Sequence, residues 1–415
     1  MSKKAAYIII VAFILLLAGS FLAFYFYSNR GTGGNIVPNG DGNIFPAGSL
    51  GVQNPPESAV APETSPTEPT GSGIETSRVD LKELSKRPSA GSVAIAASNE
   101  RGVLVRFVEK GTGNVYEVGP ETSEETRLSN TTIPRIAEVI WKKDGTHLVA
   151  RYVKDADNEV IQSYYATLGA SADGQTTGEL SGSYLTENIK AVSTNPEQDK
   201  LFYIVNHSGG TTGIIADFDG SKKTQIFDSP LREWLVEWPS AQTVTLTTKP
   251  SASIPGFMFL LNTKNGTLTR AVSGIRGLTT LTSPDASMVL YSENTRDGLS
   301  LKTYSFKKAT SETLSITTLP EKCVWSKNDS TSVYCSVPTY LGEGTYPDGW
   351  YQGVSSFSDD IWKIDASSGV ADLVAEPKKL VGRDIDGTNL FLSPKEDFLF
   401  FTNKFDSRVW SLRLQ

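Results

Sequence analysis

The sequence predicts an all-β protein, a seven-bladed β-propeller, on two observations. Short runs of bulky residues recur seven times after residue 90, mostly at intervals of about 40 to 50 residues, and a turn signal precedes each run. Tyr, Phe, Thr, Val and Ser are plentiful, while Gly and Pro interrupt the chain every few residues. A repeat of this length is typical of propellers, because each four-stranded blade buries its faces only against its neighbours. Six or eight blades are the alternatives.

One predicted strand marks each repeat, and it follows Pro, Asp-Gly or a similar turn. The turns include Lys143-Asp144-Gly145, Asn195-Pro196-Glu197 and Trp238-Pro239-Ser240. Such residues fix a tight connection between two antiparallel strands. The predicted strands are Val103–Val108, Leu148–Val153, Leu201–Val205, Val244–Thr248, Met288–Ser292, Val333–Val337 and Phe398–Thr402.

Three of these turns resemble the Ser-Pro-Asp-Gly turn of TolB-type and WD-like propeller repeats. They are Ser283-Pro284-Asp285-Ala286, Lys143-Asp144-Gly145 and Ser393-Pro394. The resemblance covers roughly residues 91–415, and the Trp-Asp dipeptide of WD repeats is absent throughout. It implies a propeller fold, and in those families the fold serves mainly protein interaction.

The last repeat ends with Arg408–Leu414, one strand short of a full blade. An open strand at that edge would be a template for aggregation. We therefore expect a segment near Ser77–Leu84 to supply the missing outer strand and close the ring.

The N-terminal segment predicts a membrane anchor. Residues 7–27 are 21 residues without a charge, and as a helix they would span about 31 Å, the thickness of a hydrocarbon core. This stretch exceeds the hydrophobic region of a cleaved signal, so we expect an uncleaved signal anchor. Lys3 and Lys4 precede it, which places residues 1–6 in the cytoplasm and the rest of the chain outside.

The segment after the anchor predicts a disordered linker. Residues 28–76 are rich in Gly, Pro, Asn, Ser and Thr, and from residue 31 to 77 there is no Lys or Arg. Such a segment cannot bury enough apolar surface to offset the entropy of ordering it. As a flexible coil it reaches roughly 40 Å from the membrane. Residues 77–415 are then the propeller.

The two cysteines favour a disulfide. Cys323 and Cys335 are equidistant from Asp329 in the turn between them, so they face each other across a symmetrical hairpin. An extracytoplasmic compartment permits the bond. Two buried free thiols are the alternative.

Composition and motifs argue against most chemistry. The formal net charge is −7 without a basic stripe, which excludes nucleic acid as an expected partner. The chain has 2 His, without metal-ligand spacing, and it lacks a Gly-x-Ser-x-Gly elbow and a phosphate-binding loop. Asp155, Asp157 and Glu159 lack the rest of a calcium loop. We therefore expect no metal site and no cofactor, and we assign no catalytic residue.

One repeat contains an insertion, residues 338–361, that the other repeats lack. Aromatic side chains at high density in a glycine-rich loop are costly to expose without a use, and loops on a rigid scaffold often bind ligands. The alternative is that the loop folds back to plug the channel or to cover a blade edge, and that its aromatic side chains form a private core. The candidate binding residues are Tyr340, Tyr346, Asp348, Trp350, Tyr351, Phe357, Asp359 and Asp360.

These features predict a single-pass, membrane-tethered extracytoplasmic propeller. Its expected role is an interaction module that binds a protein, a peptide or an envelope polymer. The alternative is an extracytoplasmic carbohydrate-active hydrolase or lyase that uses carboxylates in the propeller channel. Three or more ionisable side chains in one polar pocket would favour the enzyme, so whether the chain is an enzyme stays open.

Overall fold

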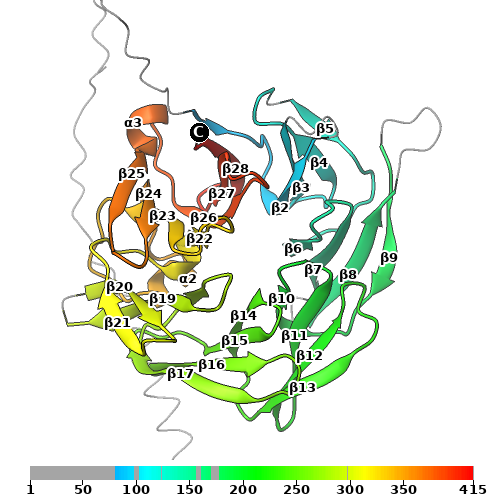
Figure 1. Cartoon of the computed structure of the whole chain (residues 1–415). Helices are drawn as coiled ribbons and strands as arrows, with labels where there is room; N and C mark the ends of the chain where they lie inside the picture. Colours follow the sequence, from blue (N-terminus) through cyan, green and yellow to red (C-terminus); the bar gives the residue numbers. More distant parts are fainter. Residues whose placement is uncertain are drawn as a thin grey trace, which may run out of the picture. The chain divides into compact units, whose positions relative to one another are not determined.

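A computed structural model describes residues 80–97, 102–122, 124–155, 160–169, 177–296 and 298–414 (Figure 1). The predicted anchor, residues 7–27, and the predicted linker, residues 28–76, lie outside these residues. Within the described part of the chain, no helix is long and apolar enough to cross a membrane.

Strands make up most of the described chain, and they form four-stranded antiparallel sheets. The first three sheets are β2 (Ser89–Ala96), β3 (Val103–Glu109), β4 (Val115–Val118), β5 (Glu125–Arg127); β6 (Ile136–Trp141), β7 (His147–Asp155), β8 (Val160–Leu168), β9 (Leu180–Tyr184); and β10 (Ile189–Thr194), β11 (Lys200–His207), β12 (Gly210–Asp217), β13 (Thr224–Ser229). The next two are β14 (Trp234–Ser240), β15 (Thr243–Thr248), β16 (Pro255–Asn262), β17 (Leu268–Arg276); and β18 (Thr280–Thr282), β19 (Met288–Thr295), β20 (Gly298–Ser305), β21 (Thr310–Thr313). The last two are β22 (Cys323–Trp325), β23 (Ser332–Pro338), β24 (Asp359–Asp365), β25 (Ala371–Ala375); and β26 (Gly387–Leu392), β27 (Phe398–Asn403), β28 (Arg408–Arg413), β1 (Leu81–Glu83).

The sheets are arranged in a ring around a central axis, with the first strand of each sheet innermost (Figure 1). The described residues form seven such sheets, which confirms seven blades over six or eight. Every strand predicted from the repeats is the second strand of a blade, from β3 to β27. The hydrophobic pattern therefore identified the same structural position in each repeat.

The ring closes through the N-terminal strand. β1 pairs with β28 in antiparallel register, with Leu81 opposite Leu412 and Glu83 opposite Trp410. This confirms the predicted outer strand near Ser77–Leu84. The β28 edge that the last repeat leaves open is thereby paired.

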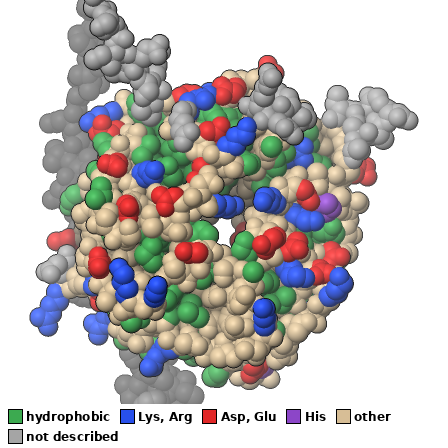
Figure 2. Space-filling model, in the orientation of Figure 1, with side chains coloured by type: hydrophobic (Ala, Val, Ile, Leu, Met, Phe, Trp, Pro, Cys, Tyr) green, Lys and Arg blue, Asp and Glu red, His purple; other side chains and the backbone are tan. Residues whose placement is uncertain are grey.

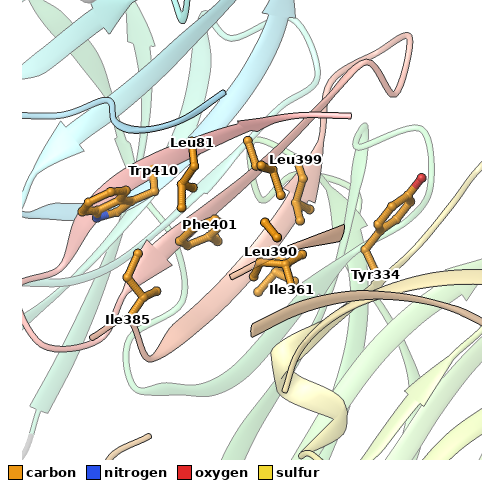
Figure 3. Packing of buried hydrophobic residues seen from close by; sticks show 10 residues of the cluster. Leu81, Tyr334, Ile361, Ile385, Leu390, Leu399, Phe401 and Trp410 are labelled. Atoms are coloured by element: carbon orange, nitrogen blue, oxygen red, sulfur yellow. The ribbon is translucent and has the colours of Figure 1, made fainter. Parts of the chain in front are cut away.

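Packing between neighbouring blades builds the core. In one cluster Tyr334 and Ile361 of the sixth blade pack with Leu399, Phe401 and Trp410 of the seventh, and Leu81 of β1 joins them (Figure 3). At 25 cal/mol per Å², each fully buried side chain of this kind contributes roughly 2 kcal/mol. The closing strand is thus held by side chains as well as by backbone pairing.

The Ser of each Ser-Pro turn has the same structural role. The hydroxyl of Ser283 accepts the backbone N–H of Met288 at 3.1 Å, and the hydroxyl of Ser393 accepts that of Phe398 at 3.0 Å. Each hydroxyl therefore binds the first residue of the following strand, which fixes the register of the hairpin. The residue at the tight corner has a positive φ, 53° at Ala286 and 59° at Glu396, where glycine is the usual choice.

The predicted disulfide joins Cys323 and Cys335, which are directly opposed in the β22–β23 pair. It connects the two inner strands of the sixth blade. Within the part of the chain described here, no free cysteine remains.

Three short helical segments all lie near the sixth blade: η1 (Pro320–Lys322), α2 (Asp348–Tyr351) and α3 (Pro377–Val381). They lie in connections that reach the start of a blade's first or third strand. Because strands alternate in direction, all such connections lie on one face of the ring. We call it the insertion face, since residues 339–358 join β23 to β24 there.

Candidate functional site

The insertion is fastened at both ends and to three other blades. Its ends are joined by the N–H of Thr339, which donates to the carbonyl of Ser358 at 2.8 Å. The carboxylate of Asp348 accepts the N–H of Ala252 at 2.6 Å, from the fourth blade. Asn294 of the fifth blade donates to the carbonyl of Tyr346, and Lys404 of the seventh donates to that of Trp350. The loop is therefore tied to the fourth, fifth and seventh blades.

Three of the candidate binding residues form a core beneath the loop. Tyr346, Trp350 and Phe357 are buried, with exposed fractions of 4%, 5% and 4%, and they pack on Leu299 and Leu319. The ring centroids of Trp350 and Phe357 lie 6.4 Å apart, nearly parallel. For these three side chains the structure shows the private core that was the alternative to a contact surface.

A buried ion cluster fixes the base of the insertion. The ammonium of Lys322, at the end of η1, donates to Asp359 at 2.7 Å, to Asp386 and to the carbonyl of Gly387 at 3.0 Å. All three charged side chains are fully buried. Burial raises the pKa of Asp359 to about 6, although Lys322 opposes the shift. A buried charge needs such partners, because the cost of removing it from water is several kcal/mol.

Asp386 connects this cluster to the aromatic core. Its carboxylate accepts the indole N–H of Trp350 and the backbone N–H of Phe357, the latter at 3.2 Å. The ammonium of Lys404 lies 4.1 Å from the centroid of the Trp350 ring. Two cations, Lys322 and Lys404, therefore lie near the ring of Trp350, and the carboxylate of Asp386 accepts its N–H. Lys322, Asp386 and Lys404 could not be singled out from the sequence, since no local pattern marks them and they meet only when the ring closes.

Other side chains of the insertion face solvent. Tyr340 is 78% exposed, Val354 80% and Tyr351 43%. Neighbouring connections of the fourth and seventh blades add Ile254 and Phe405, also exposed. We call Tyr340, Tyr351 and Val354 the exposed set. Of the other candidates, Asp348 is bound to Ala252, Asp359 is buried in the ion cluster and Asp360 is half-buried.

Two carboxylates that the sequence did not single out lie near the inner strands. Glu237 of β14 accepts the N–H of Thr282 at 2.8 Å and the hydroxyl of Thr280 at 3.1 Å. Burial raises its pKa to about 7, and Glu321 adds to the shift. Burial also raises the pKa of Glu321, which accepts the hydroxyl of Tyr351. Both carboxyls therefore belong to one electrostatically linked group.

The opening at the centre of the ring has acidic and basic side chains around it (Figure 2). Within the described residues, no three His, Cys, Asp or Glu side chains group so as to hold a metal ion. His147 and His207 lie at strand ends, each beside an aspartate. Of the acidic trio Asp155, Asp157 and Glu159, the last two lie outside the described residues.

Comparison with known proteins supports the fold. An oligogalacturonate lyase in complex with manganese is similar over 81% of this chain and 93% of that chain, with 11% identity and a TM-score of 0.53. An oligogalacturonate lyase from Vibrio parahaemolyticus is similar over 82% of this chain and 95% of that chain, also with 11% identity and a TM-score of 0.53. A TolB structure from Agrobacterium tumefaciens is similar over 57% of this chain and 87% of that chain, with 10% identity. Its TM-score of 0.38 is too low to support an argument about the fold.

The chain is a seven-bladed β-propeller. At 11% identity the similarity to the lyases shows the fold alone. No protein-family model matches the sequence, and no curated protein matches it. What the propeller does must therefore be argued from its own residues.

Proposed function

We propose that this propeller is a membrane-tethered, extracytoplasmic interaction module that binds a protein, a peptide or an envelope polymer on its insertion face. The observation that supports it most is the contrast within the insertion. Trp350 is buried among charges while its neighbour Tyr351, together with Tyr340 and Val354, faces solvent. Apolar side chains exposed on a loop that is itself firmly held are typical of binding surfaces.

The anchoring of the loop matters for affinity. Binding costs less entropy when the contact residues are already ordered. Three hydrogen bonds to other blades and the buried Lys322 cluster hold the loop before any ligand arrives. The exposed set would therefore be presented by a preorganised support.

Two features support the extracytoplasmic location. The bond between Cys323 and Cys335 forms and persists in oxidising compartments. Residues 7–27 have the length and composition of a membrane anchor with a cytoplasmic N-terminus.

The test compares two triple variants in a pull-down from envelope extracts, with partners quantified by mass spectrometry. The first variant is Tyr340→Ser, Tyr351→Ser, Val354→Ser. The control is Leu268→Ser, Val370→Ser, Leu373→Ser, which removes exposed apolar side chains from two outer strands and from a connection on the opposite face. We expect partners to be lost from the first variant and retained by the control. Equal capture by both would contradict the proposal.

Glu237 and Glu321 favour a second candidate, a carbohydrate-active hydrolase or lyase. Burial raises the pKa of both carboxyls, that of Glu237 to about 7, so Glu237 can exchange protons near neutral pH, as general acid and base catalysis requires. The test is incubation with oligogalacturonate and a panel of neutral and acidic oligosaccharides. Product formation by the wild type that is lost in both Glu237→Gln and Glu321→Gln would establish the enzyme. The absence of turnover of every substrate would count against it.

A further inference from the structure

A cavity of about 510 Å³ lies between the third and fourth blades, where their innermost strands β10 and β14 begin. Both strand starts lie on the insertion face. Four charged side chains line the cavity: Lys190, Arg232, Glu233 and Lys249. Its volume is in the range of small-molecule sites.

The charge of this cavity is opposite to that of the chain. Three cations and one carboxylate line it, whereas the whole chain has a formal net charge of −7. Glu233 neutralises one cation, Lys249, at 2.6 Å. Arg232 donates to the carbonyl of Ser208, a neutral acceptor, and it forms an ion pair with no carboxylate in the part of the chain that the structure describes. Among the described residues, no carboxylate pairs with Lys190. Two positive charges are therefore available at the rim.

The floor of the cavity is apolar and ordered. It consists of Ala191, Ile204, Trp234 and Leu235, of which Ile204 and Trp234 are buried and the other two are half-buried. The indole N–H of Trp234 donates to the carbonyl of Leu231 at 3.1 Å, and its ring packs edge-on against Phe227. Low polarity beneath the rim strengthens the attraction between the cations and an anionic group. The floor of the cavity is therefore formed before a ligand binds, and only the pairing at the rim changes.

We propose that this cavity binds an anionic group, a carboxylate or a phosphate, of a polymeric ligand. Lys190 and Arg232 contact the anion from the two strand starts, and Lys249 joins them when the ligand competes with Glu233. The anion site rests on the proposed function in one respect, namely that the ligand binds on the insertion face. The connection that begins at Lys249 also contains Ala252, which binds Asp348 of the insertion, so the two surfaces are joined.

Titration calorimetry of the full, detergent-solubilised chain with three probes tests whether the cavity binds an anionic group. Polygalacturonate presents carboxylates, polyphosphate presents phosphates, and dextran is the uncharged control. We expect binding of at least one polyanion, weakening as salt is raised from about 50 to 300 mM, and none of dextran. The polyanion that binds identifies the anionic group.

Two variants test whether the polyanion binds at this cavity. Lys190→Glu with Lys249→Glu should weaken binding on the order of tenfold or more, while Lys264→Glu, on the opposite face, should leave it unchanged. The milder Lys190→Gln with Lys249→Gln serves if the first variant melts earlier than the wild type. Absence of polyanion binding, or equal loss in the Lys264 control, would overturn the proposal. The exposed-set variant should still bind the polyanion, so failure of the pull-down and failure of this site remain distinguishable.

Discussion

The indole N–H of Trp350 lies 3.2 and 3.0 Å from the two carboxylate oxygens of Asp386, across 36 positions of the chain. Trp350 belongs to the insertion of the sixth blade and Asp386 to the connection that enters the seventh. This contact joins the aromatic core of the insertion to the buried Lys322 cluster. The exposed side of the insertion is therefore held in place by the buried aromatic core and the Lys322 cluster beneath it.

Trp350→Ala should release the insertion. Removal of a buried Trp side chain costs about 3 to 5 kcal/mol, and here it also leaves Asp386 with one fewer donor. Hydrogen exchange of residues 340–357 should rise by orders of magnitude. Tyr340→Ala is the matched variant, and it should change exchange little because that side chain is 78% exposed. Unchanged exchange in Trp350→Ala would show that the core beneath the loop does not hold it.

Lys322→Met should destabilise the whole propeller. It leaves two buried carboxylates without their cation, a change that typically costs about 3 to 5 kcal/mol. Adding Asp359→Asn should recover part of the loss, because one buried charge is then removed. Lys154→Met, which breaks an exposed pair with Glu187, should leave the urea midpoint unchanged. Equal midpoints for Lys322→Met and the wild type would refute the importance of the cluster.

Loss of the disulfide should lower stability by about 3 kcal/mol. Cys323 and Cys335 are separated by 12 positions, and closing a loop of this length removes that much entropy from the unfolded chain. The measurement is urea unfolding of Cys323→Ala with Cys335→Ala, compared with reduced wild type. The two should agree, whereas an unchanged midpoint after reduction would mean that the bond adds no stability.

Glu237 should make the free energy of unfolding depend on pH. Its pKa is raised from 4.5 to about 7 in the folded state, so the folded protein binds a proton more tightly than the unfolded chain. The resulting stability is fully present below pH 4.5 and is lost as pH rises through 7, by up to roughly 3 kcal/mol. Glu237→Gln removes this dependence. Its unfolding free energy relative to wild type should therefore increase between pH 5 and pH 8, and a constant difference would contradict the raised pKa.

Much of the fold could be predicted because it is encoded locally. Strand patterns, Ser-Pro turns and the opposed cysteines each depend on residues close together in sequence, and the closing strand follows from the unpaired edge of the last repeat. The register of the β22–β23 hairpin follows from the same local symmetry.

The site could be predicted only in part, because its chemistry is formed by distant segments. Lys322 meets Asp359 and Asp386 across 37 and 64 positions, which only the closed ring brings together. Tyr346, Trp350 and Phe357 were singled out with Tyr340 and Tyr351, yet the first three are buried. In an irregular loop no periodicity tells the inner side chains from the outer ones, so exposure required the structure.

Site-specific photo-crosslinking in the full chain tests the binding surface most directly. A photoreactive phenylalanine analogue replaces Tyr340 or Tyr351 of the exposed set, or Leu373 on the outer strand of the same blade as the control. We expect the same crosslinked partner from Tyr340 and Tyr351 and none from Leu373. Crosslinks from Leu373 alone, or none from either tyrosine while the partner still co-purifies, would contradict it.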